Sequence, residues 1–472
     1  MDEACWPRVE AAARVVEEAA RGVRPVYGIN TGFGKLAMTR IAPEQIKELQ
    51  RRLVVSHMCG CGPALPDPVV RLVLVLKAAS LARGHSGVRR RTVELLLALY
   101  NHDALPMIPA KGSVGASGDL APLAHLTGCL LGLGEMRHGG TALPAAEVLA
   151  TIGEEPLTLG AKEGLALLNG TQVSSALALA GLFGAKAVFE AALLAGAMSV
   201  DAALASDVPF DPRLHASRGQ PGQIRVAERL RALLEGSAIR ASHLECDRVQ
   251  DPYSLRCQPQ VMGACLDLLD GAAATLEREA NGVSDNPLVF AKDGAILSGG
   301  NFHGQPVAFA ADQIALALAE IGSLAERRIA LLTDPNLSGL PAFLTPEPGL
   351  NSGFMLAQVT AAALASENQH LAHPVSIDSR PTSANQEDHV SMATYASRRL
   401  LEMLENAAAI IAIELLAAAQ GIELRRPLQS SARLEAALLE IRSFSAFLRD
   451  DRPLSVEIRA VADWVKRYAT AA

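Results

Sequence analysis

The sequence reads DHVSMATYASRRLLEMLENAAAIIAIELLAAAQ over residues 388–420, with no proline or glycine to interrupt a helix. Gly421 follows as a natural stop. Much of the stretch, such as residues 407–413, is apolar on every face, which means that the helix is buried on several sides. Residues 388–420 therefore predict one long helix inside a bundle of other helices.

Two further ranges, 306–332 and 354–371, are also predicted to be helices with the same apolar character. Aromatic residues make up only 4% of the 472, and Ala and Leu dominate, which favours helices over strands. We expect a mainly α fold. Long helices without a polar face need partner helices, and one chain does not supply enough of them. An oligomer built on a shared bundle is therefore expected.

The pattern along the chain changes twice. Residues 1–168 mix short helical patterns with glycine-rich turns, residues 169–424 are dominated by long helices, and residues 425–472 form a more polar tail with shorter helices. We predict three regions with these boundaries.

Charge and cysteine content exclude several classes of protein. Lys and Arg number 43 against 50 Asp and Glu, a net charge of −7, so the chain lacks the basic face that nucleic acid requires. The apolar stretches 173–185 and 407–419 are shorter than the ~20 residues that cross a bilayer. The start of the chain does not resemble a signal peptide, and seven cysteines are too few for a disulfide framework. We expect a cytoplasmic protein without membrane or nucleic-acid partners.

No metal site is predicted. His57, Cys59 and Cys61 lie at alternate positions, which is tighter than the usual zinc spacing, and no second ligand pair follows. We interpret the two cysteines as buried thiols beside a functional histidine.

Residues 108–119, IPAKGSVGASGD, are small and flexible, and composition alone favours a surface turn. Backbone chemistry offers a second interpretation. In a tight bend the Gly118 nitrogen can attack the Ala116 carbonyl carbon, because glycine has no Cβ to block the approach. Loss of water from the ring and from the Ser117 side chain would leave a conjugated methylidene, an electrophile made without any added cofactor.

Residues 112–125, GSVGASGDLAPLAH, closely resemble the signature of the histidine and aromatic amino acid ammonia-lyases. The resemblance extends over nearly the whole chain, through the blocks YGINTGFG (27–34), EGLALLNGT (163–171), QDPYSLR (250–256), GGNFH (299–303), SANQEDH (383–389) and DRPL (451–454). It implies an elongated, fumarase/aspartase-like bundle of long helices, with a smaller mixed N-terminal region that carries the reactive loop. It also implies a homotetramer whose pockets are shared between subunits.

In this family the Ala-Ser-Gly tripeptide cyclises into a methylidene-imidazolone (MIO) group, so the resemblance implies an MIO formed from Ala116, Ser117 and Gly118. This electrophile bonds the substrate amine and makes it a better leaving group. The resemblance assigns Asn169 to stabilise the negative charge on the ring oxygen. It assigns Tyr27 as the base for the β-proton, although an ordinary phenol is deprotonated only near pH 10.

The remaining matched residues imply a substrate pocket. The planar fork of Arg256 suits the substrate carboxylate. Tyr253, one helical turn earlier, is expected on the same face in support, and Gln250 one turn before that. Phe302 matches a pocket wall. Taken alone, Arg256 would be interpreted as a surface residue.

Two features favour an imidazole substrate. Ser56 and His57 occupy the pair that selects the substrate ring in the family, and Glu387 stands where relatives acting on phenyl rings usually have Gln. A carboxylate accepts a charge-assisted hydrogen bond from an imidazole N–H. A phenyl ring would leave the carboxylate unpaired, at a cost of roughly 1–3 kcal/mol. The implied reaction is L-histidine to trans-urocanate and ammonia.

Other functions stay open. Gly304 and Gln305 stand where histidine-specific relatives usually have Ala-Glu, and they favour an MIO enzyme acting on tyrosine or phenylalanine, as a lyase or 2,3-aminomutase. A helical scaffold without catalysis is a second alternative. A Ser/His/Asp hydrolase using Ser117 is a third.

Overall fold

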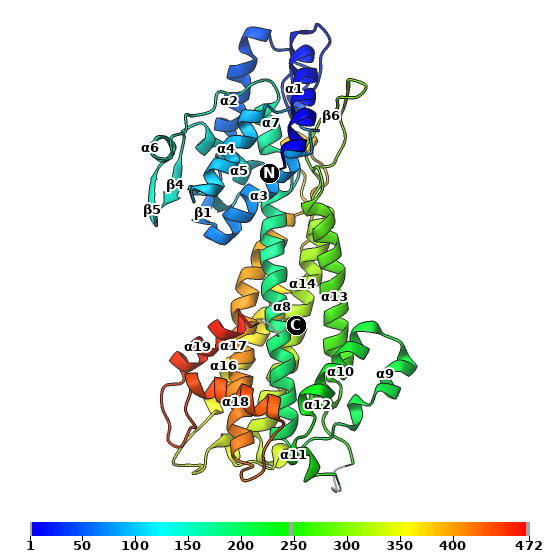
Figure 1. Cartoon of the computed structure of the whole chain (residues 1–472), viewed down its shortest axis with the longest axis vertical. Coiled ribbons are helices and arrows are strands. Elements are labelled where there is room, and N and C mark those ends of the chain that lie inside the picture. Colours follow the sequence, from blue (N-terminus) through cyan, green and yellow to red (C-terminus); the bar gives the residue numbers. More distant parts are fainter. Residues whose placement is uncertain (1, 245–248, 469–472) are drawn as a thin grey trace. The chain divides into compact units, whose positions relative to one another are not determined.

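The computed structural model describes residues 2–244 and 249–468 of the chain, which are mainly helical (Figure 1). Internal contacts divide the chain into two compact units. The first comprises Met1–Ala180, Ala273–Asp312 and Pro374–Arg398, and the second Gly181–Ala272, Gln313–His373 and Arg399–Ala472. The predicted regions 1–168, 169–424 and 425–472 stay a prediction, and the last four residues lie outside the described part.

The first unit contains short helices joined by turns and small sheets. Its α-helices are α1 (Trp6–Arg21), α2 (Ile46–His57), α3 (Asp67–Ala82), α4 (Arg90–Asn101), α5 (Leu120–Leu130), α6 (Ala145–Thr151) and α7 (Glu163–Leu168). Four 3₁₀ turns accompany them: η1 (Glu3–Cys5), η2 (Gly34–Leu36), η3 (Pro43–Gln45) and η6 (Ser383–Asn385). This mixture agrees with the short helical patterns and glycine-rich turns expected near the N-terminus.

The strands of the first unit form three small antiparallel sheets. β1 (Cys61–Ala64) pairs with β3 (Pro109–Lys111), and β2 (Leu105–Pro106), β4 (Glu135–His138) and β5 (Thr141–Pro144) form a meander in the order β2-β4-β5. β6 (Leu288–Phe290) and β7 (Ala295–Leu297) form a hairpin. The β1–β3 pair leads directly into the Ala-Ser-Gly loop.

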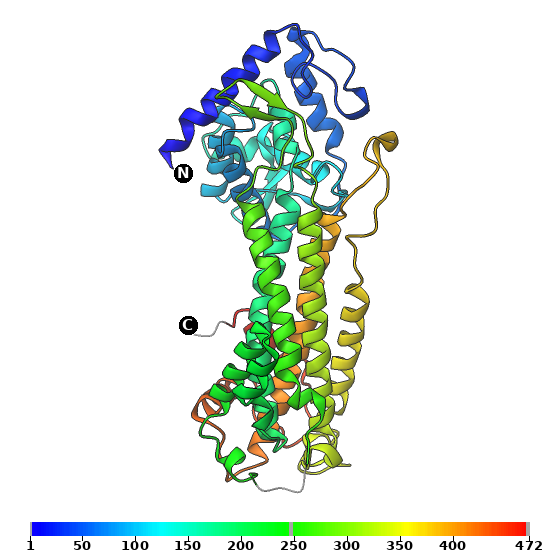
Figure 2. The same cartoon turned by 90° about the vertical axis from the view of Figure 1, so that its right-hand side faces the viewer.

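Four long helices contribute residues to both units: α8 (Gln172–Ala202), α13 (Gln258–Ala280), α14 (Gln305–Thr333) and α17 (Ala393–Glu423). In the second unit they run side by side (Figures 1 and 2). The other elements there are η4 (Val208–Phe210), α9 (Pro212–Arg218), α10 (Pro221–Leu234), α11 (Ala238–Ala241), α12 (Tyr253–Arg256), α15 (Pro335–Ser338), η5 (Ala342–Leu344), α16 (Met355–Leu371), α18 (Ala432–Phe444) and α19 (Ser455–Val465). The prediction of a mainly α fold with long bundled helices is confirmed.

The longest predicted helix begins and ends later than expected. α17 starts at Ala393, because Met392 has a left-handed φ of +57° and its N–H donates to the Val114 carbonyl. Gly421 lies inside α17 and does not stop it. A Cβ there would lie 2.8 Å from the Cβ of Ala202, so this glycine permits close packing of α8 against α17. The predicted burial of residues 407–413 is confirmed except at half-buried Ala409.

Glu414 interrupts the apolar surface of α17 and is fully buried. Arg328 of α14 pairs with it, with Nη2 and Oε2 2.8 Å apart, and Ser199 of α8 donates to Oε1 at 2.7 Å. This pairing satisfies the buried charge and links three helices of the second unit.

The apolar stretch 173–185 noted in the sequence is shorter than the helix that contains it, α8. By length and composition alone, α8 and α14 are long and apolar enough to cross a membrane. Within the most apolar part of each, 61% of α8 and 72% of α14 is buried inside the fold. Buried core helices of soluble proteins pass the same test, so this observation is weak evidence for a membrane span.

Candidate active site

The Ala-Ser-Gly loop connects β3 to α5 and is sharply bent at residues 115–117. Gly118 has a left-handed φ of +74°, and a Cβ there would lie only 2.2 Å from the carbonyl oxygen of Gly170. The next residue, Asp119, donates its N–H to that same oxygen at 2.7 Å. Only glycine fits at position 118, and the bend is held against the segment between α7 and α8.

Ser117 is held at both of its oxygens. The side-chain amide of Asn169 donates to the Ser117 carbonyl oxygen at 2.6 Å, and the Ser117 hydroxyl donates to Oε1 of Glu387 at 2.9 Å. Asn169 is 2% exposed, and its own Oδ1 has no hydrogen-bond partner among the described residues. The loop thus brings together three of the predicted site residues.

Glu387 is a half-buried carboxylate surrounded by donors. Its Oε2 accepts from the hydroxyls of Thr382 at 2.7 Å and Ser383 at 2.8 Å. Burial alone would raise the pKa of Glu387, but these two bonds, the Ser117 hydroxyl and the charge of His57 together lower it below its ordinary value. Glu387 is therefore ionised at neutral pH.

Asp119 supports the loop from inside the protein. Its carboxylate is fully buried and accepts from the Ser174 N–H at 2.7 Å and the Thr394 hydroxyl at 2.6 Å, with Ser113 more distant at 3.3 Å. Burial raises the pKa of Asp119, and these donors act in the opposite direction. The network ties both ends of the loop to α8 and α17.

Lys77 is a second buried charged group behind the loop. Its Nζ donates to the Asn169 carbonyl oxygen at 2.7 Å and to Oε1 of Gln172 at 3.1 Å. Desolvation lowers the pKa of Lys77 to about 7, against the opposing charge of Asp285. Lys77 thereby fixes the backbone of the residue whose amide reaches Ser117.

The other candidates in the first unit are His57, Tyr27 and Phe302. His57 ends α2, and its Nδ1 is 2.8 Å from the Leu53 carbonyl oxygen. The Tyr27 hydroxyl accepts the Gly34 N–H at 3.3 Å, and the following turn, η2, contacts η6, which precedes Glu387. Phe302 is half-buried just before α14.

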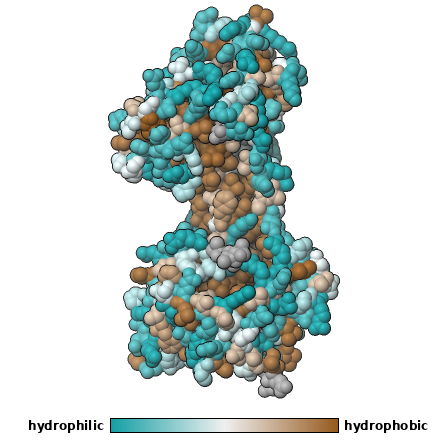
Figure 3. Space-filling view, in the orientation of Figure 1, coloured by the Kyte–Doolittle hydropathy of each residue, from teal (hydrophilic) through white to brown (hydrophobic). Residues whose placement is uncertain are grey.

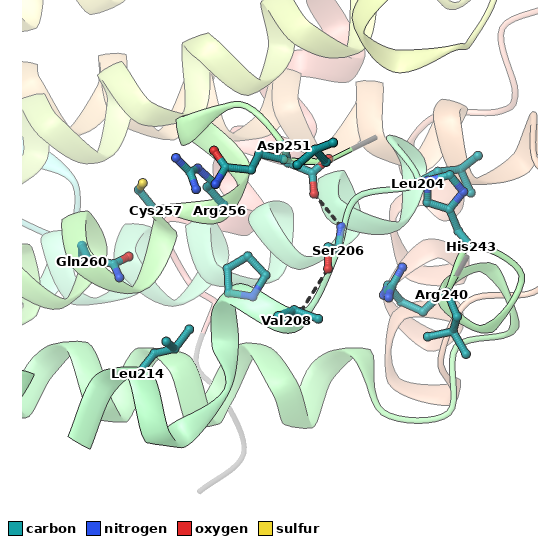
Figure 4. A pocket seen from close by; sticks show the side chains of 14 residues that line it. Leu204, Ser206, Val208, Leu214, Arg240, His243, Asp251, Arg256, Cys257 and Gln260 are labelled. Carbon is teal, nitrogen blue, oxygen red and sulfur yellow. Dashed lines mark hydrogen bonds between the residues drawn. The ribbon is translucent and has the colours of Figure 1, made fainter. Parts of the chain in front are cut away.

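The remaining candidates belong to the second unit. Tyr253 and Arg256 lie on one face of α12, with the guanidinium carbon 4.7 Å from the Tyr253 ring centre, as predicted. Arg256 lines a cavity of about 490 Å³ together with Gln250, Gln260 and Arg240 (Figure 4). Its Nε is buried without a hydrogen-bond partner among the described residues. A guanidinium with unused donors suits a carboxylate.

The chemistry of the loop fits an MIO group. Ring closure requires a bend at Ala116–Gly118 and no Cβ at the third residue, and both conditions are met. The Ser117 carbonyl would become the ring oxygen, and it already accepts from Asn169. Among the described residues, no cluster of three His, Cys, Asp or Glu side chains could hold a metal ion.

Comparison with known proteins settles the family. The family model for aromatic amino acid lyases matches residues 1–443. This chain belongs to the aromatic amino acid lyase family. It is 62% identical over 471 residues to a histidine ammonia-lyase of Aromatoleum aromaticum, covering 100% of this chain and 90% of the relative.

Solved structures of aromatic amino acid lyase relatives share the fold. Histidine ammonia-lyase from Trypanosoma cruzi is 42% identical, with a TM-score of 0.92 over 99% of this chain and 88% of that one. Tyrosine aminomutase from Streptomyces globisporus is 36% identical, with a TM-score of 0.93 over 99% and 92%. The family predicted from the sequence is confirmed.

Two sequence interpretations of this lyase were wrong. Gln250 precedes α12 in an irregular segment and does not extend its face, because the helix begins only after Pro252. Cys59 and Cys61 are exposed, because they lie at and just before an edge strand outside the core.

Sequence reasoning also missed several residues around the lyase loop. Lys77 could have been noticed as a lone charge within the apolar run LVLVLKAAS. Thr382 and Thr394 carry no such signal, since hydroxyl residues are common in loops and helix starts, and Ser383 lies in the matched block SANQEDH, which assigns it no role. Asp119, next to the loop, is the aspartate that the Ser/His/Asp alternative would use, but its carboxylate accepts from Ser174 and Thr394 instead.

Proposed function

We propose that this chain is a histidine ammonia-lyase that converts L-histidine to trans-urocanate and ammonia. One observation carries the proposal: an ionised carboxylate, Glu387, lies 2.9 Å from the Ser117 hydroxyl of a bent Ala-Ser-Gly loop. The carboxylate suits the ring N–H of an imidazole. The 62% identity to a histidine ammonia-lyase over the full chain supports the same substrate.

The prosthetic group in this proposal is an MIO formed from Ala116, Ser117 and Gly118, which supplies an electrophile for the substrate amine. Asn169 donates to the Ser117 carbonyl oxygen and stabilises negative charge that collects there. Tyr27 accepts the β-proton of the substrate. No metal takes part.

The remaining candidate residues bind the substrate. Arg256 pairs with the substrate carboxylate, and Tyr253 holds the guanidinium in place by stacking. His57 and Glu387 bind the imidazole ring. Gln250 and Phe302 complete the pocket.

We further propose a cytoplasmic homotetramer in which subunits share active sites. Hydrophobic side chains gather over the long helices (Figure 3). On these helices and on α16, the second unit exposes Phe183, Leu316, Leu356 and Val359, with Phe183 57% exposed. Such surfaces favour burial against another subunit. Gln250, Tyr253 and Arg256 of one subunit would then complete the pocket of another. The six described cysteines are unpaired, which supports a reducing compartment.

The alternative is a tyrosine or phenylalanine lyase, or a 2,3-aminomutase. Gly304 favours it, since histidine-specific relatives usually have alanine at this place. In this chain an alanine Cβ at position 304 would lie 2.9 Å from the Cβ of Ala393, so the packing here suits glycine. The 36% identity to tyrosine aminomutase also favours this alternative.

One assay separates the two functions. The purified chain is incubated with L-histidine, L-tyrosine or L-phenylalanine, and urocanate, coumarate and cinnamate are followed by absorbance, with β-amino acids detected by chromatography. We expect urocanate from histidine at the highest rate. Coumarate, cinnamate or a β-amino acid as the main product would support the alternative instead.

A further inference from the structure

We propose that Thr382 and Ser383 are positioning residues that orient the Glu387 carboxylate and so set the preference for an imidazole ring. The inference rests on the proposed function, because it assigns Glu387 to the ring N–H of the substrate. It adds two hydroxyls that act only through Glu387.

The two hydroxyls bind the same oxygen. Thr382 Oγ1 lies 2.7 Å and Ser383 Oγ 2.8 Å from Oε2 of Glu387. The other oxygen, Oε1, accepts from Ser117. Two donors on one oxygen prevent free rotation of the carboxylate, so that Oε1 keeps a fixed direction toward the Ala-Ser-Gly loop.

The backbone is shaped to bring these hydroxyls back onto Glu387. Thr382 and Glu387 form an antiparallel bridge, with the Thr382 N–H donating to the Glu387 carbonyl at 2.9 Å. Between them Ser383, Ala384 and Asn385 all have positive φ, at +51°, +53° and +63°. Such conformations are unfavourable for residues other than glycine and persist where the surroundings hold them. The tight turn places residues 382 and 383 against the side chain at 387.

The other groups near Glu387 are consistent with an acceptor role. His57 lies close enough for its charge to lower the pKa of Glu387, together with the two hydroxyls. The turn also contacts η2 in the loop after Tyr27. A carboxylate held in its ionised form can only accept hydrogen bonds, and an imidazole N–H is a donor.

Formation of the MIO ring would leave Oε1 of Glu387 without its hydrogen-bond donor. Loss of the Ser117 hydroxyl as water removes the donor to Oε1, whereas Thr382 and Ser383 continue to hold Oε2. Oε1 is then available to one N–H of the substrate ring. A phenyl ring has no such donor, so weakening the two hydroxyl contacts must affect histidine and spare phenylalanine.

The experiment compares Thr382→Val, Ser383→Ala and the double variant with the unmodified chain. We expect kcat/KM for L-histidine to fall ~10–100-fold in the double variant, as for loss of hydrogen bonds to a charged group. Residual kcat/KM for L-phenylalanine should stay unchanged. Thr151→Val, whose exposed hydroxyl bonds only its own helix α6, is the matched control and should behave like the unmodified chain.

A binding measurement gives a readout independent of turnover. In a Ser117→Ala background, calorimetry should show the dissociation constant of L-histidine rising by a similar factor in the double variant, with the melting temperature retained. Unchanged histidine binding, or an equal loss for both substrates, would overturn the inference.

A double-mutant cycle separates this inference from the proposed function. Added to Glu387→Gln, the Thr382→Val change should cause no further loss for histidine, because its effect passes through the carboxylate. A full additional loss would overturn the positioning role while leaving the proposed function intact. If the unmodified chain makes no urocanate, the proposed function fails and this inference fails with it.

Discussion

The side-chain amide of Asn169 donates a hydrogen bond of 2.6 Å to the carbonyl oxygen of Ser117. Lys77 Nζ donates to the backbone carbonyl oxygen of Asn169 at 2.7 Å. A donor fixed in this way needs no reorganisation when negative charge develops on the oxygen, which is the arrangement that stabilises charge most effectively.

Asn169→Ala tests that contact. Because the lost donor acts on developing charge, kcat should fall by ~10²–10³ with little change in KM. Urocanate absorbance measures the rate, and the mass of the intact chain shows whether ring formation still occurs. A raised KM with unchanged kcat would contradict the assignment of Asn169.

Glu387→Gln tests the substrate. An amide can still pair with one ring atom but loses the charge-assisted bond, so histidine turnover should fall ~10–100-fold while the ring still forms. The matched control is Glu94→Gln, a partly exposed carboxylate on α4 that pairs with Arg90 one turn earlier. Unchanged histidine turnover would refute an imidazole site at Glu387.

Gly118→Ala tests the shape of the loop. The new Cβ would lie 2.2 Å from the Gly170 carbonyl, so we expect a lower melting temperature and no ring formation by mass. Gly153→Ala is the control, since Gly153 has a nearly identical φ of +75° and open space around it. Equal effects of the two substitutions would show that backbone strain alone, and not the contact with Gly170, matters.

Lys77→Met tests the buried charge through the pH dependence of stability. The pKa of Lys77 is lowered to about 7 in the fold from an ordinary value of 10.5. Between these values the unfolded chain binds more protons, so this residue makes stability rise with pH from 7 toward 10.5. Below pH 7 Lys77 is protonated in both the folded and the unfolded chain. The cost of burying its charge then lowers the free energy of unfolding in full.

Urea unfolding at pH 7 and pH 9.5, at one protein concentration, measures this effect. The unmodified chain should gain stability relative to Lys77→Met across that interval, by on the order of a few kcal/mol. Lys47→Met, at an exposed position on α2, should show no such difference. A parallel pH dependence in Lys77→Met and the unmodified chain would contradict a lowered pKa.

The long helices could be predicted from the sequence because a long, mostly apolar run of helix-forming residues is a local signal. The predicted ranges 306–332 and 354–371 differ from α14 and α16 by one residue at most at each end. The start of α17 could not be predicted, because it depends on the bond from Met392 to Val114, a residue far away in sequence.

In the candidate site, too, some residues could be predicted from local sequence and others could not. Residues 116–118 could be predicted from chemistry, since the bend needs glycine at the third place and the electrophile needs a serine. The contacts of Lys77 and Thr382 could not, because they depend on segments brought together by folding. Composition also cannot distinguish a buried lysine with two acceptors from an exposed one.

The mass of the intact, purified chain tests the central claim most directly, namely that Ala116, Ser117 and Gly118 cyclise. We predict a mass lower than that of the linear sequence by two water molecules, and by none in Ser117→Ala. The full linear mass in a preparation that converts histidine to urocanate would contradict this account.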